Sequence, residues 1–168
     1  MSTGQPAQPL SAPFVSSIMP IEPQWIDYNG HLNVAYYNVL FDRAVDELYE
    51  LVGLGPSYLE RTGHSTMVVE AHVRYLRELK LNEPVRVFVQ LLDYDAKRIH
   101  LFEELRHATG DWLSATSETM TLGVDMTTKK VGPFEDSVLQ GLARMKTAHA
   151  ALPRPDAAGR RVAMPNRP

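Results

Sequence analysis

The chain has 168 residues, 44% hydrophobic and 22% charged, a composition typical of one globular domain rather than of a disordered protein. Its formal net charge of -3 excludes the strongly basic surface with which nucleic-acid-binding proteins meet phosphates. It contains no cysteine, which excludes disulfides, thiolate catalysis and cysteine-ligated zinc.

The two ends of the chain differ in composition from its middle. Residues 1–13 are rich in Gln, Pro, Ser and Ala, and residues 150–168 combine four prolines with Ala, Gly and Arg. We therefore expect a disordered N-terminal tail at 1–13, a folded domain at 14–149 and a flexible C-terminal tail at 150–168. Because no signal-peptide pattern or apolar run of ~20 residues occurs, we expect a cytoplasmic protein with no membrane partner.

The first half of the domain predicts one irregular strand and one long helix. Residues 14–25 mix β-branched and aromatic side chains with two prolines, which favours an edge or irregular strand. Apolar residues in the segment 37–52 recur at three- and four-residue spacing, as in an amphipathic helix. Asn33 is well placed to cap the start of this helix, and the glycines and proline of segment 53–56 to end it.

The second half predicts an antiparallel sheet and a closing helix. A strand with alternating side chains begins at residue 66. Three further strands at 84–94, 98–109 and 112–126 are separated by turn-forming residues, which favours a meander. Residues 135–150 have helical spacing. A long apolar helix followed by consecutive antiparallel strands is typical of the α+β class.

The most informative segment lies just before the long helix, at residues 25–36. Its polar side chains alternate at Asp27, Asn29, His31 and Asn33. The segment resembles the turn before the central helix of hotdog-fold thioesterases. The alternation is similar to the Asp-x-Asn-x-His-x-Asn signature of acyl-ACP thioesterases.

This resemblance implies a hotdog fold, in which an antiparallel β-sheet wraps around a long central helix. It also implies a thioesterase that takes an acyl-CoA substrate, needs no cofactor and forms a homodimer or a dimer of dimers, with active sites at the subunit interface. Segments 25–33 and 73–79 together also resemble bacterial thioesterases of carnitine degradation, which cleave betainyl-CoA. The carrier, CoA or ACP, stays open at this point.

Two other functions of the same fold are alternatives. A hotdog protein can retain the pocket and bind acyl-CoA without turnover. Hotdog hydratases add water to enoyl-CoA with an Asp and a His five positions apart, whereas Asp27 and His31 are four positions apart. The spacing therefore favours thioester hydrolysis over hydration.

Thioester hydrolysis needs a base or nucleophile and donors for the oxyanion. Asp27 and Glu78 are the candidate bases, and Asn29 and His31 are candidates to position substrate and water. Glu78 resembles the glutamate that follows the helix in the acyl-ACP branch, on a strand whose alternation would place it on the same face as Val68. An exposed face with mixed charges would show the same alternation.

The candidate substrate-binding residues surround the start of the helix. Backbone amides from Gly30 to Asn33 lie at the positive end of the helix dipole, and a glycine permits close approach of the substrate. The candidates for an aromatic wall that would attract a trimethylammonium group are Trp25, Tyr28, Tyr36, Tyr37 and Trp112. A plain turn, an N-cap and core-filling aromatics are the structural alternatives. No metal site is predicted, because ligand spacing such as His-x-x-x-His is absent.

Overall fold

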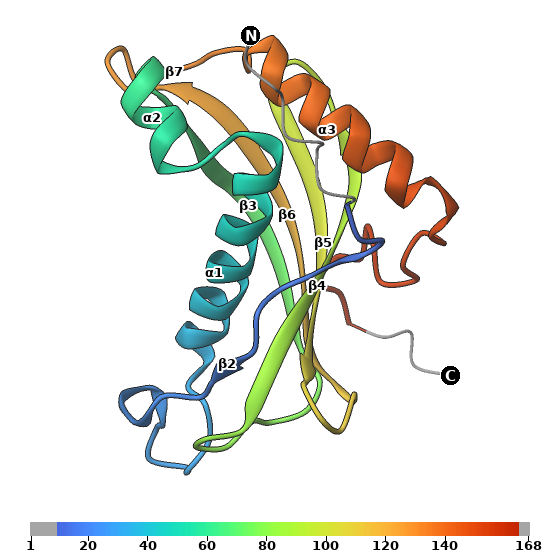
Figure 1. Cartoon of the computed structure of the whole chain (residues 1–168). Helices are drawn as coiled ribbons and strands as arrows, with labels where there is room; N and C mark the ends of the chain where they lie inside the picture. The colour runs from blue at the N-terminus through green and yellow to red at the C-terminus, as the bar shows by residue number, and fades with distance from the viewer. Residues whose placement is uncertain (1–9, 165–168) are drawn as a thin grey trace, which may run out of the picture.

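A seven-stranded antiparallel sheet forms the centre of the computed structural model, which describes residues 10–164 (Figure 1). Its strands are β1 (Phe14–Val15), β2 (Met19–Pro20), β3 (His64–Tyr75), β4 (Pro84–Tyr94), β5 (Arg98–His107), β6 (Leu113–Asp125) and β7 (Lys130–Val131). The main order is β1-β4-β5-β6-β3, with β2 paired to β4 and β7 paired to β6. The predicted meander therefore forms the middle of the sheet, and β3 is left at one edge.

The long helix α1 (Val34–Val52) has the ends that the sequence predicts. The side-chain Oδ1 of Asn33 accepts a hydrogen bond from the Ala35 N–H at 3.0 Å, and Gly53 closes the helix with φ of 85°. A second helix, α2 (Pro56–Thr62), was not expected, because its glycine and proline signals were interpreted only as a stop. Proline is well tolerated in the first turn of a helix, where its missing N–H costs nothing.

The core lies between α1 and the sheet (Figure 1). The buried face of α1 comprises Tyr37, Leu40, Phe41, Ala44, Leu48, Tyr49 and Val52. These positions follow the helical spacing of the sequence, and they meet the alternating apolar residues of β4 and β5. The third helix, α3 (Asp136–Ala148), packs against both α1 and β4. No helix within residues 10–164 is long and apolar enough to span a membrane.

Two features of β3 differ from the straight alternation expected for residues 66–78. A bulge between Val68 and Glu70 shifts the register, so that Val68 and Ala71 line the same cavity rather than opposite faces. The strand also ends at Tyr75, which places Glu78 in the loop that leads to β4 rather than on a strand face.

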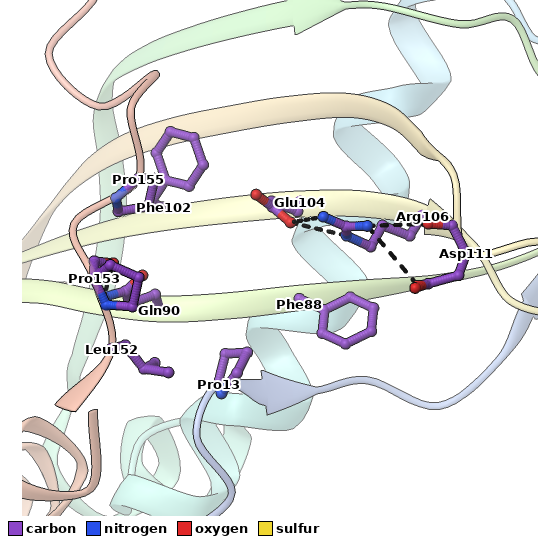
Figure 2. Close-up of a pocket in the computed structure, with 10 residues that line it drawn as sticks. All are labelled: Pro13, Phe88, Gln90, Phe102, Glu104, Arg106, Asp111, Leu152, Pro153 and Pro155. Carbon is purple, nitrogen blue, oxygen red and sulfur yellow. Dashed lines mark hydrogen bonds and ion pairs between the residues drawn. The ribbon is translucent and has the colours of Figure 1, made fainter. Parts of the chain in front are cut away.

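The segment after α3, which was expected to be part of a flexible tail, makes specific contacts with the outer face of the sheet. The Gln90 side-chain amide donates to the Pro153 carbonyl at 3.3 Å, and the Gly159 N–H donates to Oε2 of Glu118 at 2.7 Å. Figure 2 shows Pro153 and Pro155 against side chains of the outer face, with α1 on the far side of the strands. Residues 165–168 lie outside the described part of the chain.

The N-terminal segment is joined to the same region by His149. Its Nε2 donates to the Ser11 carbonyl at 3.0 Å, and its Nδ1 accepts the Leu91 N–H at 3.0 Å. Burial lowers the pKa of His149, so the ring is neutral at pH 7, as these two bonds require. Residues 1–9 of the expected N-terminal tail lie outside the described residues.

Candidate active site

A closed turn holds the predicted catalytic residues just before α1. The Asp27 carbonyl accepts the Gly30 N–H, and the Asp27 N–H donates to the His31 carbonyl, each at 3.0 Å. Oδ1 of Asp27 also accepts the Asn29 N–H at 2.8 Å, as in an Asx-turn. Gly30 has φ of 78°, which L-residues with a Cβ adopt only with strain. This local network fixes the orientation of the Asp27 carboxylate and leaves its Oδ2 without a hydrogen-bond partner among the described residues.

A hydrogen bond between distant segments brings Glu78 to this turn. The Leu32 N–H donates to the Leu79 carbonyl at 2.8 Å, which ties the loop after β3 to the residues that precede α1. As a result, Nε2 of His31 lies 3.0 Å from Oε2 of Glu78. The carboxylate can orient the ring, which is the arrangement that a general acid–base histidine needs.

Most backbone amides of the turn already have acceptors. Those of Gly30, Leu32 and Asn33 donate to carbonyl oxygens within the fold. Among the described residues, no acceptor is hydrogen-bonded to the amides of His31 and Val34. The amides from Gly30 to Asn33 were expected to bind the oxyanion together. Of these, only the His31 amide is left to do so, and the Val34 amide, at the first helical position, is a second donor.

A cleft of about 420 Å³ opens beside these groups. Asp27, His31 and Glu78 line one part of it, and Tyr37 and Tyr75 line another. The two tyrosine rings meet edge to face, with centroids 5.0 Å apart. Burial raises the pKa of Tyr37, so its hydroxyl stays protonated at neutral pH and is able to donate a hydrogen bond.

Several predicted site residues lie away from the cleft. Tyr28 is 97% exposed, whereas Trp25 is buried and stacks on Tyr36 with ring centroids 5.7 Å apart. Arg43 covers the Trp25 ring at 4.9 Å from its centroid, so no face of this indole is free for a substrate cation. The side chain of Asn29 is exposed and does not line the cleft. The role of Asn33 in the structure is to cap α1, and that of Gly30 is to shape the turn.

Sequence reasoning missed four residues that line the cleft, namely Val34, Tyr75, Leu76 and Arg77. Tyr75 was counted only as part of the alternation of β3, whereas Tyr37, which also lines the cleft, was a candidate for the aromatic wall. Arg77 is the cation closest in sequence to Glu78, and its guanidinium carbon lies 3.9 Å from the centroid of the Trp112 ring. These residues lie together because β3 pairs with β6 and because the β3–β4 loop is hydrogen-bonded to the turn.

Comparison with known proteins agrees with this geometry. Residues 21–142 match the family model of the thioesterase-like superfamily. The chain belongs to this superfamily. A betainyl-CoA thioesterase from Pseudomonas aeruginosa is 38% identical to it over 146 residues, which cover 87% of this chain and 92% of that protein.

Two further likenesses extend this result. An L-carnitine dehydrogenase/betainyl-CoA thioesterase from Rhizobium meliloti is 39% identical over 142 residues, covering 84% of this chain and 28% of that protein. A solved structure of a Staphylococcus aureus protein in complex with CoA has a TM-score of 0.85 at 28% identity, covering 93% of this chain and 98% of that one. The comparisons confirm the predicted hotdog fold and the prediction of an acyl-CoA thioesterase.

This thioesterase also has a cavity of about 430 Å³ on the outer face of the sheet (Figure 2). Its charged side chains are paired with one another, since Arg106 contacts Glu104 at 2.8 Å and Asp111 at 3.9 Å. The remaining lining residues are Phe88, Gln90, Phe102, Leu152 and three prolines, one of them Pro13. The cavity therefore presents paired charges and mainly apolar surface, whereas in the cleft Oδ2 of Asp27 has no hydrogen-bond partner among the described residues. Residues 10–164 contain no group of three or more His, Cys, Asp or Glu side chains that could hold a metal ion.

Proposed function

We propose that this thioesterase hydrolyses betainyl-CoA to betaine and free CoA. The arrangement at the start of α1 carries the proposal, because a carboxylate, a histidine–carboxylate pair and two amides without acceptors surround one cleft. The choice of acyl group is supported by the two relatives named above, both of which are named as betainyl-CoA thioesterases.

In the proposed reaction, water attacks the thioester carbonyl carbon while a carboxylate accepts its proton. Asp27 suits this role, because the Asn29 N–H holds Oδ1 and leaves Oδ2 for the water. The amides of His31 and Val34 stabilise the negative charge that develops on the carbonyl oxygen, an effect worth ~3 kcal/mol per donor. When the carbon–sulfur bond breaks, protonated His31 delivers a proton to the leaving thiolate, and Glu78 stabilises that protonated ring.

We further infer that two copies of the chain pair through β3. Among strands of residues 10–164, this one pairs only with β6, and its exposed stretch carries Met67, Val68 and Val69, which are 42%, 55% and 57% exposed. An edge with unpaired backbone groups and apolar side chains is a natural site for strand pairing. A monomeric mass in light scattering at micromolar concentration would overturn this inference.

Release of CoA, followed with a thiol reagent, tests the proposed reaction. We expect release from betainyl-CoA, and a loss of about 100-fold or more in kcat for Asp27→Asn, which keeps the turn geometry and removes the charge. Asp111→Asn is the matched control, since Asp111 lies at the outer cavity and has a φ of 52° that asparagine accepts. Tight acyl-CoA binding without thiol release would instead support the non-catalytic alternative.

A further inference from the structure

Two tyrosines from different elements form an aromatic corner in the active-site cleft. Tyr37 of α1 and Tyr75 at the end of β3 both line the cleft, and their ring planes meet at 75° with centroids 5.0 Å apart. Because the rings are nearly perpendicular, each turns one π face toward the angle between them. Tyr75 is 46% exposed, so the corner is open to solvent on its side, whereas Tyr37 is buried.

The charges of the cleft favour a cation as the group that enters this corner. Asp27 and Glu78 bring two carboxylates to the lining. Among the described residues that line the cleft, Arg77 is the one arginine or lysine, and its guanidinium carbon lies 3.9 Å from the ring centroid of Trp112, which lies outside the lining. A positively charged group in the cleft is therefore attracted both by aromatic faces and by an excess of carboxylates.

The ring of Tyr37 lies beside the amide that binds the thioester oxygen in the proposed reaction. Tyr37 follows Val34 by three residues, so the two share a helix face with a rise of about 4.5 Å between them. Long side chains of a helix lean toward its N-terminus. Accordingly, the Tyr37 hydroxyl lies near the backbone of Leu79, whose carbonyl accepts the N–H of Leu32, a residue that precedes α1. The Tyr37 side chain thus extends back past Val34.

We propose that Tyr37 and Tyr75 bind the trimethylammonium group of betainyl-CoA and so determine the choice of acyl group. This inference rests on the proposed function, because it takes the thioester oxygen to bind the Val34 amide. The nitrogen is two bonds, about 2.5 Å, from the carbonyl carbon, and the methyl groups add about 1.5 Å, so the cation stays beside the first turn of α1. A quaternary ammonium donates no hydrogen bonds, and ring faces bind it without needing an acceptor.

Recognition of charge is separated from recognition of shape by two substrates of the same form. 3,3-Dimethylbutyryl-CoA has a tert-butyl group where betainyl-CoA has trimethylammonium. We expect the intact enzyme to have the higher kcat/KM for betainyl-CoA. Tyr75→Leu keeps apolar bulk at an exposed position but removes the ring face, and it should reduce this preference by about 5- to 10-fold, mainly through KM. Tyr75→Phe keeps the ring face and should retain the preference.

Two further variants complete the set. Tyr37→Leu should lower the preference in the same direction, with circular dichroism to show that this variant of a buried residue is folded. Tyr94→Leu is the matched control, because Tyr94 ends β4 at the opposite end from the loop that borders the cleft. It should keep the preference of the intact enzyme.

The outcomes distinguish the cation site from the reaction itself. An intact enzyme that hydrolyses both substrates equally, or a Tyr75→Leu variant that keeps the preference or loses activity on both substrates in equal proportion, would overturn the cation site while the hydrolase remains. Equal losses of preference in Tyr75→Phe and Tyr75→Leu would assign the effect to the hydroxyl and overturn it as well. An intact enzyme that hydrolyses neither substrate would overturn the proposed function.

Discussion

His31 Nε2 and Glu78 Oε2 lie 3.0 Å apart, and this contact joins the turn before α1 to the loop after β3. The two side chains are 35% and 53% exposed, so the pair borders the open cleft rather than the core. An exposed ion pair of this kind contributes only about 0–1 kcal/mol to stability. Its main effect is expected on the reaction, where the carboxylate holds the imidazole in position to transfer a proton.

Substitution of either partner should therefore lower activity much more than stability. We expect His31→Asn and Glu78→Gln each to reduce kcat on the preferred acyl-CoA by about 100-fold, because each removes a part of one proton-transfer unit. The double variant should be scarcely slower than the slower single variant, since residues that act as a unit are not additive. Steady-state kinetics of the four proteins measures this. Fully multiplicative losses would show that the two residues act independently.

The cap of α1 links stability to the oxyanion site. Asn33→Ala removes the acceptor for the Ala35 N–H, which should lower the free energy of unfolding by about 1 kcal/mol. Because the Val34 amide is the next group in the chain, kcat should fall as well. Asn33→Ser keeps a capping oxygen and should retain most of both quantities, measured by urea unfolding and by thiol release. Equal losses in Ala and Ser variants would argue against a capping role.

Burial raises the pKa of Glu103 to about 8, which predicts how stability changes with pH. Because the folded protein binds this proton more tightly than the unfolded chain does, the contribution is fully present below the usual pKa of 4.5 and is lost as pH rises through about 8. Glu103→Gln mimics the protonated form at every pH. Its free energy of unfolding should exceed that of the intact protein by a margin that grows between pH 5 and 9, at up to about 1.4 kcal/mol per pH unit.

Denaturant unfolding at several pH values measures this margin, with Glu104→Gln as the control that should retain the pH dependence of the intact protein. Asp42 is the titratable group of α1 whose charge acts on Glu103, and it disfavours ionisation of that carboxyl group. The residues of β3 and β6 that line the cavity between α1 and the sheet, where Glu103 lies, do not titrate. A margin that stays constant with pH would mean that Glu103 is already ionised in the folded protein.

Packing between α3 and α1 depends on a glycine. A Cβ at Gly141 would lie 2.6 Å from the carbonyl oxygen of Val52 and 2.8 Å from its Cα. Gly141→Ala should therefore lower the free energy of unfolding by about 1 kcal/mol or more, even though alanine is the better helix former. Ser137→Ala, at an exposed position of α3, is the control and should change stability little. Increased stability of Gly141→Ala would show that the two helices separate without cost.

The elements that the sequence predicted well depend on neighbours within a few residues. The helix of residues 34–52, its cap at Asn33 and the turn around Gly30 follow from apolar spacing, one side-chain hydrogen bond and one positive φ. The grouping of Asp27 with His31 follows from the same turn. Such interactions join residues that are close together in the sequence, so they can be predicted without knowledge of the fold.

Glu103 is part of an alternating pattern in the sequence, but its burial was not predicted from that pattern. Ile99, Leu101, Glu103 and Leu105 alternate along β5, which places an acid among residues that face the core. Only the position of α1 over this strand shows that the acid borders a cavity beside Asp42. The presence of a charge in a buried row was thus a property of the sequence, whereas its surroundings were decided by packing.

Contacts between segments far apart in the chain were decided by the tertiary structure alone. The Leu32–Leu79 hydrogen bond brings Glu78 to His31, and the sheet order leaves β3 at an edge. The burial of Trp25 and the exposure of Tyr28 have the same origin. The sequence by itself determined which local elements form and where the reactive turn lies. Which side chains face that turn depends on strand register and helix packing, because these arise from the whole core at once.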